Sequence, residues 1–189
     1  MPTFVSRAGL KLEHALATFA MDVTGQTCAD LGCNAGGFTD CLLQRGAAKV
    51  YAIDTGYGVL DWKLRKDPRV VVMERTNAMH ATLPEPVSFI CIDVAWTRQR
   101  NILPAARRLL AAQGEIVTLL KPHYESPPAF LRNGILPEEK LDEVLARVYP
   151  DMEAAGFAVV ATVMSPIKGA KGNAEMLCRL RAQEPAAST

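Results

Sequence analysis

Short, predominantly apolar runs alternate with amphipathic segments along this chain, and the alternation restricts the possible folds more than any other feature of the sequence. The runs TCADLG, KVYAID, RVVVME, VSFICID and EIVTLLK have the length of strands, and most are rich in β-branched residues. Apolar runs of this kind are typical of parallel strands that are covered on both faces. The alternation therefore predicts an α/β fold with a mostly parallel, doubly wound sheet.

Helical patterns separate these runs. Apolar residues recur at spacings of three and four over residues 7–21, and Ser6 stands where an N-cap is expected. The last two runs, FAVVATVMS and AEMLCRLRA, flank a turn of glycine and lysine and are expected to pair, which adds one antiparallel edge strand. Further helices are expected at about residues 37–44, 98–112 and 137–156.

Length and composition predict one domain. A chain of 189 residues, 49% of them apolar, buries one sizeable core. We expect a single domain over residues 1–189, with an N-terminal amphipathic helix inside residues 1–24 and a flexible tail at residues 182–189. No apolar stretch approaches the length of a membrane span, which favours a soluble, cytoplasmic protein without a membrane partner.

Cysteine spacing argues against a metal site, and the net charge argues against nucleic-acid binding by bulk positive charge. The five cysteines form no CxxC pair and have no histidine cluster beside them, so we expect buried, reduced thiols and no metal site. The net charge of +1 is too small to hold nucleic acid by bulk positive charge. Any contact with RNA is expected to be local, at Arg7 with Lys11 or at Lys168 with Lys171, although each pair alone is more typical of a solvated surface.

The first run leads into a glycine-rich turn, DLGCNAGGF, which contains Asp30, Gly32, Gly36 and Gly37. Glycine lets the backbone turn sharply and approach a ligand closely. The spacing is not GxGxxG, so a nucleoside-like cofactor is favoured over a dinucleotide. The alternative is a glycine turn that only packs.

Polar residues also follow the later runs, at the carboxyl edge where such sheets bind ligands. Asp54 can accept hydrogen bonds from the ribose of NAD or S-adenosylmethionine, and Asn77 can satisfy an adenine edge or simply form a turn. Asp93 ends the fourth run and Lys121 ends the fifth. An ammonium beside that carboxylate avoids an unpaired buried charge, although an isolated lysine after a strand is more often on the surface.

Three separated stretches make the sequence resemble a known family. SRAGLKLEHAL, the long segment from DLGCNAGGF to ERTNA, and SPIKGAKGNAEML are similar to the methyltransferase domain of the hemolysin A (TlyA-like) family of ribosomal RNA 2′-O-methyltransferases, which is related to FtsJ. The similarity covers nearly the whole chain. It implies a Rossmann-like fold, S-adenosyl-L-methionine as the cofactor, and RNA, in particular ribosomal RNA or a ribosomal subunit, as the substrate.

The resemblance also implies a site. The Lys, Asp, Lys, Glu tetrad of that superfamily matches Lys11, Asp93, Lys121 and Glu175. We expect Lys121 to take the proton of a ribose hydroxyl as a neutral amine, with Lys11 as the neighbouring positive charge and the two carboxylates orienting the amines. The cofactor is expected along Asp30, Gly32, Asn34, Gly36, Gly37, Phe38, Asp54, Asn77 and Asp93.

Two departures from the family bear on RNA. Its members usually carry an N-terminal S4 RNA-binding domain that this sequence lacks, so we expect a partner protein to replace it or a different RNA to be the target. The segment AWTRQRN replaces SFISL, and Trp96 and Arg98 are expected to contact a base unless Trp96 caps the core. A small-molecule O-methyltransferase and a non-catalytic RNA- or cofactor-binding module remain alternatives, and the oligomeric state is left open.

Overall fold

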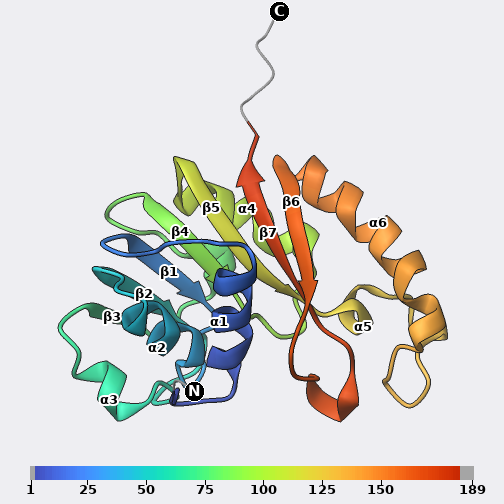
Figure 1. Cartoon of the computed structure of the whole chain (residues 1–189), viewed down its shortest axis with the longest axis horizontal. Coiled ribbons are helices and arrows are strands. Elements are labelled where there is room, and N and C mark those ends of the chain that lie inside the picture. Colours follow the sequence, from blue (N-terminus) through green and yellow to red (C-terminus); the bar gives the residue numbers. More distant parts are fainter. Residues whose placement is uncertain (1–2, 184–189) are drawn as a thin grey trace, which may run out of the picture.

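The computed structural model describes residues 3–183, in which seven strands form one sheet in the order β3-β2-β1-β4-β5-β7-β6 (Figure 1). Strands β1 to β5 pair in parallel, and β7 is antiparallel to both of its neighbours. The strands are β1 (Thr27–Leu31), β2 (Lys49–Ile53), β3 (Val70–Met73), β4 (Val87–Ile92), β5 (Leu110–Leu120), β6 (Phe157–Met164) and β7 (Met176–Ala182).

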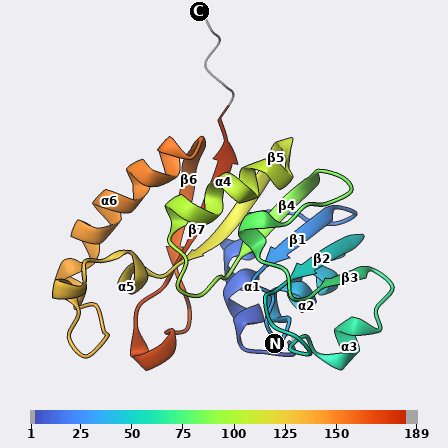
Figure 2. The same cartoon turned by 180° about the vertical axis from the view of Figure 1, so that it is seen from behind.

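Helices cover both faces of this sheet. Helices α1 and α2 pack on one face, and Figure 2 shows α4 and α6 on the other. The helices are α1 (Ala8–Thr18), α2 (Gly37–Gln44), α3 (Trp62–Arg65), α4 (Gln99–Leu109), α5 (Pro122–Glu125) and α6 (Leu141–Ala154). Short 3-10 turns are η1 (Ala78–His80), η2 (Pro128–Phe130), η3 (Glu138–Lys140) and η4 (Ala170–Gly172).

The predicted fold class is confirmed: the sheet is mostly parallel and doubly wound, with an antiparallel pairing at one side. The antiparallel strand, β7, lies between β5 and the edge strand β6. All five cysteines are buried and free, as predicted. Within residues 3–183 no helix is long and apolar enough to cross a bilayer.

Several predicted boundaries were wrong. Helix α1 begins at Ala8, and its N-cap, Arg7, makes no side-chain cap bond. Ser6 does not cap the helix because its hydroxyl lies against Gly37 of α2. Helix α4 ends at Leu109 because the chain there already pairs with β4 through Leu110.

The predicted tail at residues 182–189 was wrong at its start. Ala182 pairs with Phe157 in the sheet, and the backbone N–H of Gln183 donates to the carbonyl of Gly156. Residues 184–189 lie outside the described residues, so the prediction of a flexible tail stays untested there.

The order of the strands reverses between β1 and β4, and the chain is tightly packed at that point. Gly32 follows β1 with φ +88°, and a Cβ there would stand 2.7 Å from the carbonyl oxygen of Asp93 after β4. Sheets of this type bind ligands in the crevice beside such a reversal. The fold therefore places the ends of β1, β2, β4 and β5 around one candidate site.

Replacing Gly36 should destabilise the fold more than replacing a glycine of similar backbone conformation in open space. At Gly36, φ is +97° and a Cβ would collide with Leu64 and stand 2.7 Å from Leu60. Gly25 has φ +72° with nothing near its Cβ position. We expect Gly25→Ala to cost about 1 kcal/mol and Gly36→Ala about 2–4 kcal/mol in urea unfolding. Equal losses would contradict the packing role of Gly36.

Candidate active site

The first cavity, which we call the Asp54 cavity, lies at the carboxyl ends of β1, β2 and β4 and has a volume of about 380 Å³. Its polar walls include Asp54, Thr55 and Asn77, and its apolar walls include Met79 and Ile102. The combination suits a ligand with one flat apolar face and several hydroxyl groups.

Backbone hydrogen bonds fix the carboxylate of Asp54. Its Oδ2 accepts from the backbone N–H of Asn34 at 2.9 Å, and its Oδ1 accepts from that of Gly56 at 2.7 Å. Oδ1 of Asn77, which also lines the cavity, accepts from the N–H of Met79 and so opens η1. The turns after β1, β2 and β3 are thus held in place by side chains that line the cavity.

The second cavity, which we call the Lys121 cavity, has a volume of about 360 Å³ and lies between α1, the ends of β4 and β5, and the loop before β7. All four residues of the expected tetrad line it, although they are widely separated in sequence. They are Lys11, Asp93, Lys121 and Glu175.

The tetrad forms two ion pairs. The Nζ of Lys121 lies 2.6 Å from Oδ1 of Asp93 and donates to the carbonyl of Val94 at 3.2 Å. Lys11 donates to Oε2 of Glu175, and these two side chains are only 6% and 4% exposed. A charged side chain buried to this extent requires a partner, so each member of this pair depends on the other.

The two cavities adjoin. Gly32, Asn34, Asp93 and Ala95 line both of them. Asp93 therefore belongs to the wall of the Asp54 cavity and also holds Lys121 in the neighbouring one. A group bound in the first cavity can reach a group bound in the second across this boundary.

Asp30 lies behind the site and lines neither cavity. It is fully buried, its Oδ2 accepts from the N–H and the hydroxyl of Thr39, and its Oδ1 has no partner within the described part of the chain. Burial raises the pKa of Asp30 to about 7; the bonds from Thr39 oppose this rise and the charge of Asp93 adds to it. Its visible role is to tie β1 to α2.

The other residues of the glycine turn divide into two groups. Gly32 and Asn34 line both cavities, and Phe38 lines the Lys121 cavity. Gly36 and Gly37 line neither, because Leu60 and Leu64 pack on the first and α1 packs on the second. For these two glycines, the alternative of a turn that packs describes the structure better than close approach to a ligand.

The residues expected to contact RNA are dispersed. Arg7 lines the Lys121 cavity, whereas Lys168 and Lys171 are exposed on the loop before β7, on either side of the lining residue Gly169. Trp96 lines the Asp54 cavity and is 82% exposed, so the alternative that it caps the core was wrong. Arg98 lines a third cavity, together with Arg100 and Arg147.

Sequence reasoning missed His123 and Tyr124, which both line the Lys121 cavity. The Tyr124 ring lies 5.0 Å from that of Trp96 and 4.0 Å from that of His123, centroid to centroid. His123 is 9% exposed, and its Nδ1 has no partner among the described residues. Their position in KPHYE, directly after the strand that ends in Lys121, was the available signal.

A doubly wound sheet with a cavity at the reversal of strand order is the arrangement in which Rossmann-like folds bind a nucleotide-like ligand. Together with a match to a methyltransferase family, it identifies the chain as a Rossmann-like S-adenosylmethionine-dependent methyltransferase. The FtsJ-like methyltransferase family matches residues 4–182. The chain belongs to this family.

Relatives agree with this assignment. The chain is 43% identical over 186 residues to YqxC of Bacillus subtilis, a candidate rRNA methyltransferase. The alignment covers 94% of this chain and 65% of that protein. It is 41% identical over 187 residues to the 16S/23S rRNA (cytidine-2′-O)-methyltransferase TlyA of Mycobacterium tuberculosis, covering 95% of this chain and 69% of TlyA. The chain therefore spans about two thirds of the length of these relatives.

Solved structures show the same fold. A candidate hemolysin from Streptococcus thermophilus superposes with a TM-score of 0.94 at 40% identity, covering 97% of this chain and 69% of that one. A candidate S-adenosylmethionine-dependent methyltransferase from Listeria monocytogenes reaches a TM-score of 0.69 at 16% identity, with 94% of this chain and 99% of that one covered. The second likeness shows the fold alone.

His123 should make stability depend on pH. Burial, and to a smaller extent the charge of Lys121, lower the pKa of His123, so the unfolded chain binds a proton here at a higher pH than the folded chain does. The free energy of unfolding therefore falls as the pH drops below about 6.5. In urea unfolding, the free energy of unfolding of His123→Gln should decrease less than that of the wild type between about pH 7 and pH 5. The exposed-residue control His80→Gln should keep the wild-type slope, and equal slopes for all three proteins would refute the effect.

Proposed function

We propose that this chain transfers a methyl group from S-adenosylmethionine to a ribose 2′-hydroxyl of ribosomal RNA. The observation that carries the proposal is the pair of lysine-carboxylate contacts, Lys11 with Glu175 and Lys121 with Asp93, in a cavity that shares Asp93 with the Asp54 cavity. The family assignment supports methyl transfer, and the name of the Mycobacterium tuberculosis relative supports an rRNA ribose as the acceptor.

The Asp54 cavity fits the cofactor chemically. Asp54 and Thr55 offer oxygen atoms to ribose hydroxyls, Asn77 offers an amide to an adenine edge, and Met79 and Ile102 offer apolar contact to the ring. When bound, S-adenosylmethionine supplies a methyl group on a positively charged sulfur. Gly32 and Asn34 would support its chain beneath the boundary with the Lys121 cavity.

We assign proton removal from the ribose hydroxyl to Lys121. A ribose hydroxyl is a weak nucleophile near neutral pH, so an amine held beside it speeds the reaction by accepting its proton. Asp93 orients this amine through the 2.6 Å contact, and Lys11 lines the same cavity. Glu175 in turn orients Lys11. Holding the hydroxyl in line with the methyl group accounts for further acceleration.

We further propose that Arg7, Trp96, Lys168 and Lys171 contact the RNA around the mouth of these cavities. Arg98 would contact it only where the RNA continues over the third cavity. Because the net charge of the chain is +1, these contacts are few for a ribosomal substrate, and a partner protein that adds cationic contacts is part of the proposal. The proposed site of action is the cytoplasm, where ribosomal RNA is available.

Lys121→Ala should abolish methylation while cofactor binding is retained. We expect methyl transfer to fall by about 10²–10⁴-fold and cofactor affinity to change by less than about twofold, because Lys121 does not line the Asp54 cavity. The measurement is incorporation of radiolabelled S-adenosylmethionine into ribosomal subunits and total RNA, followed by nucleoside analysis, with calorimetry for cofactor binding. Lys49→Ala, at the amino end of β2, serves as the matched control and should be fully active.

Two outcomes would refute the proposed methyl transfer, and a third would refute the role assigned to Lys121. Labelling of a base rather than a ribose would exclude 2′-O transfer. If the cofactor binds but no RNA is labelled in any ribosomal fraction, even after a candidate partner protein is added, the alternative of a non-catalytic RNA- or cofactor-binding module is favoured. Equal loss of cofactor binding and methylation in Lys121→Ala would show that this lysine is structural.

A further inference from the structure

Residues 55–66, which follow β2 and include α3 and are here called the α3 segment, expose large apolar side chains next to the Asp54 cavity. Tyr57 is 72% exposed and Trp62 is 67% exposed, with Val59 at 37% between them. Thr55 and Val59 of the same segment line the Asp54 cavity. Clustered exposed side chains of this size commonly mark a binding surface.

A positively charged side chain lies over the ring of Tyr57 and another over the ring of Trp62. The guanidinium carbon of Arg75 lies 4.3 Å from the centroid of the Tyr57 ring, and the Nζ of Lys66 lies 4.8 Å from the centroid of the Trp62 ring. These are favourable cation–π distances. The surface therefore combines flat aromatic faces with positive charge, which is how proteins commonly bind single-stranded nucleic acid.

The acidic side chains nearby are engaged elsewhere. Glu74 pairs with Arg65, Asp67 pairs with Arg69 at 2.7 Å, and Asp61 accepts from the backbone N–H of Lys63 at 2.8 Å as the N-cap of α3. Within residues 3–183, Lys66 and Arg75 form no ion pair with a carboxylate. These two cations are consequently available to an anionic partner.

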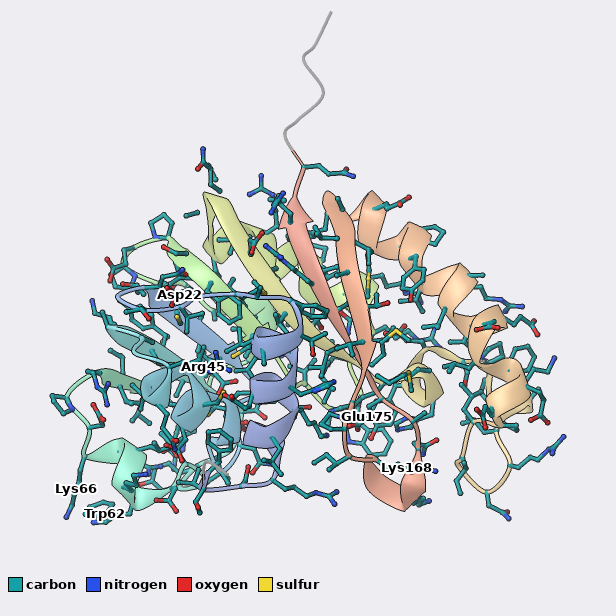
Figure 3. The ribbon with its side chains drawn as sticks, viewed as in Figure 1. Asp22, Arg45, Trp62, Lys66, Lys168 and Glu175 are labelled. Atoms are coloured by element: carbon teal, nitrogen blue, oxygen red, sulfur yellow. The ribbon has the colours of Figure 1, made fainter. Side chains whose placement is uncertain are left out.

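Helix α3 lies on the edge of the molecule where the parallel strands end. Figure 3 shows Trp62 and Lys66 at the lower left of the molecule and Lys168 to their right, with Glu175 above Lys168. Glu175 lines the Lys121 cavity, whereas Thr55 and Val59 connect the α3 segment to the Asp54 cavity. A strand with one nucleotide in the Lys121 cavity can continue along this edge towards α3.

We propose that Tyr57, Trp62, Lys66 and Arg75 form a docking surface for single-stranded RNA next to the methylated nucleotide. Bases stack on the free faces of the two rings, and phosphates contact the two cations. The proposal deepens the proposed function and rests on it for the identity of the strand as substrate. Because Lys66 and Arg75 have no ion pair with a carboxylate within residues 3–183, their charge favours RNA over a mixed acidic and basic protein surface as the occupant.

The test measures binding of a fluorescein-labelled, single-stranded RNA of mixed sequence to the full chain by anisotropy over a series of KCl concentrations. Trp62→Leu should weaken binding by about tenfold because one base loses its stacking partner. Lys66→Gln should reduce the slope of log affinity against log salt by about 0.7, the value for one phosphate contact on a single strand. Both side chains are exposed, so thermal stability and cofactor affinity should match the wild type.

Lys49→Gln is the matched control. Its Nζ also lies near a tyrosine ring, 5.6 Å from the centroid of Tyr51, but at the amino end of β2 on the opposite edge of the sheet. This variant should keep the RNA affinity and the salt slope of the wild type. A loss equal to that of Lys66→Gln would show a general charge effect and overturn the docking surface.

The outcomes separate this inference from the proposed function. If the wild type methylates ribosomal RNA and Trp62→Leu and Lys66→Gln leave RNA affinity, salt slope and KM unchanged, the docking surface is wrong and the proposed function stands. If both variants weaken RNA binding but the wild type labels no RNA, the docking surface stands and the proposed function fails. If the docking surface and the proposed function are both correct, Trp62→Leu and Lys66→Gln raise the KM for RNA and leave kcat at saturating RNA at the wild-type value.

Discussion

The buried pair of Lys11 and Glu175 is the contact on which the arrangement of the candidate active site depends. It joins α1, at the beginning of the described chain, to the segment that enters β7, 164 residues later. Removing one partner would leave a charge that is at least 94% buried without compensation, a loss of about 3–5 kcal/mol. The pair therefore ties α1 to the loop before β7 at the wall of the Lys121 cavity, and under the proposed function catalysis and stability would depend on the same two side chains.

The reversal of strand order between β1 and β4 explains why two cavities meet at Asp93. Because the chain passes from β1 to α2 on one face of the sheet and from β4 to α4 on the other, the turns after these two strands separate and leave a crevice. Gly32 lets the turn after β1 approach the carbonyl of Asp93 closely, which brings the two cavities into contact. Under the proposed function, a cofactor in the Asp54 cavity and an RNA nucleotide in the Lys121 cavity would meet at this carboxylate.

The polar residues and segments of the candidate site lie at the same carboxyl edge of the sheet. Asp54, Lys121, the loop before β7 and the α3 segment all follow the ends of strands and lie at this edge. Exposed aromatic rings with cations over them extend the edge beyond the cavities. Conversely, Asp30, Gly36 and Gly37 lie behind it and hold β1, α2 and α3 together.

The alternation of apolar runs determined the strands, the helices and the parallel sheet, because burial on both faces leaves a local pattern in the chain. The position of each polar residue after a run likewise indicated the edge at which Asp54, Asp93 and Lys121 would lie. Only the tertiary structure decided that β7 inserts between β5 and β6, that Gly36 packs on Leu64, and that His123 enters the Lys121 cavity. These features depend on contacts between distant segments, whose energies are set by shape and burial that no local pattern records.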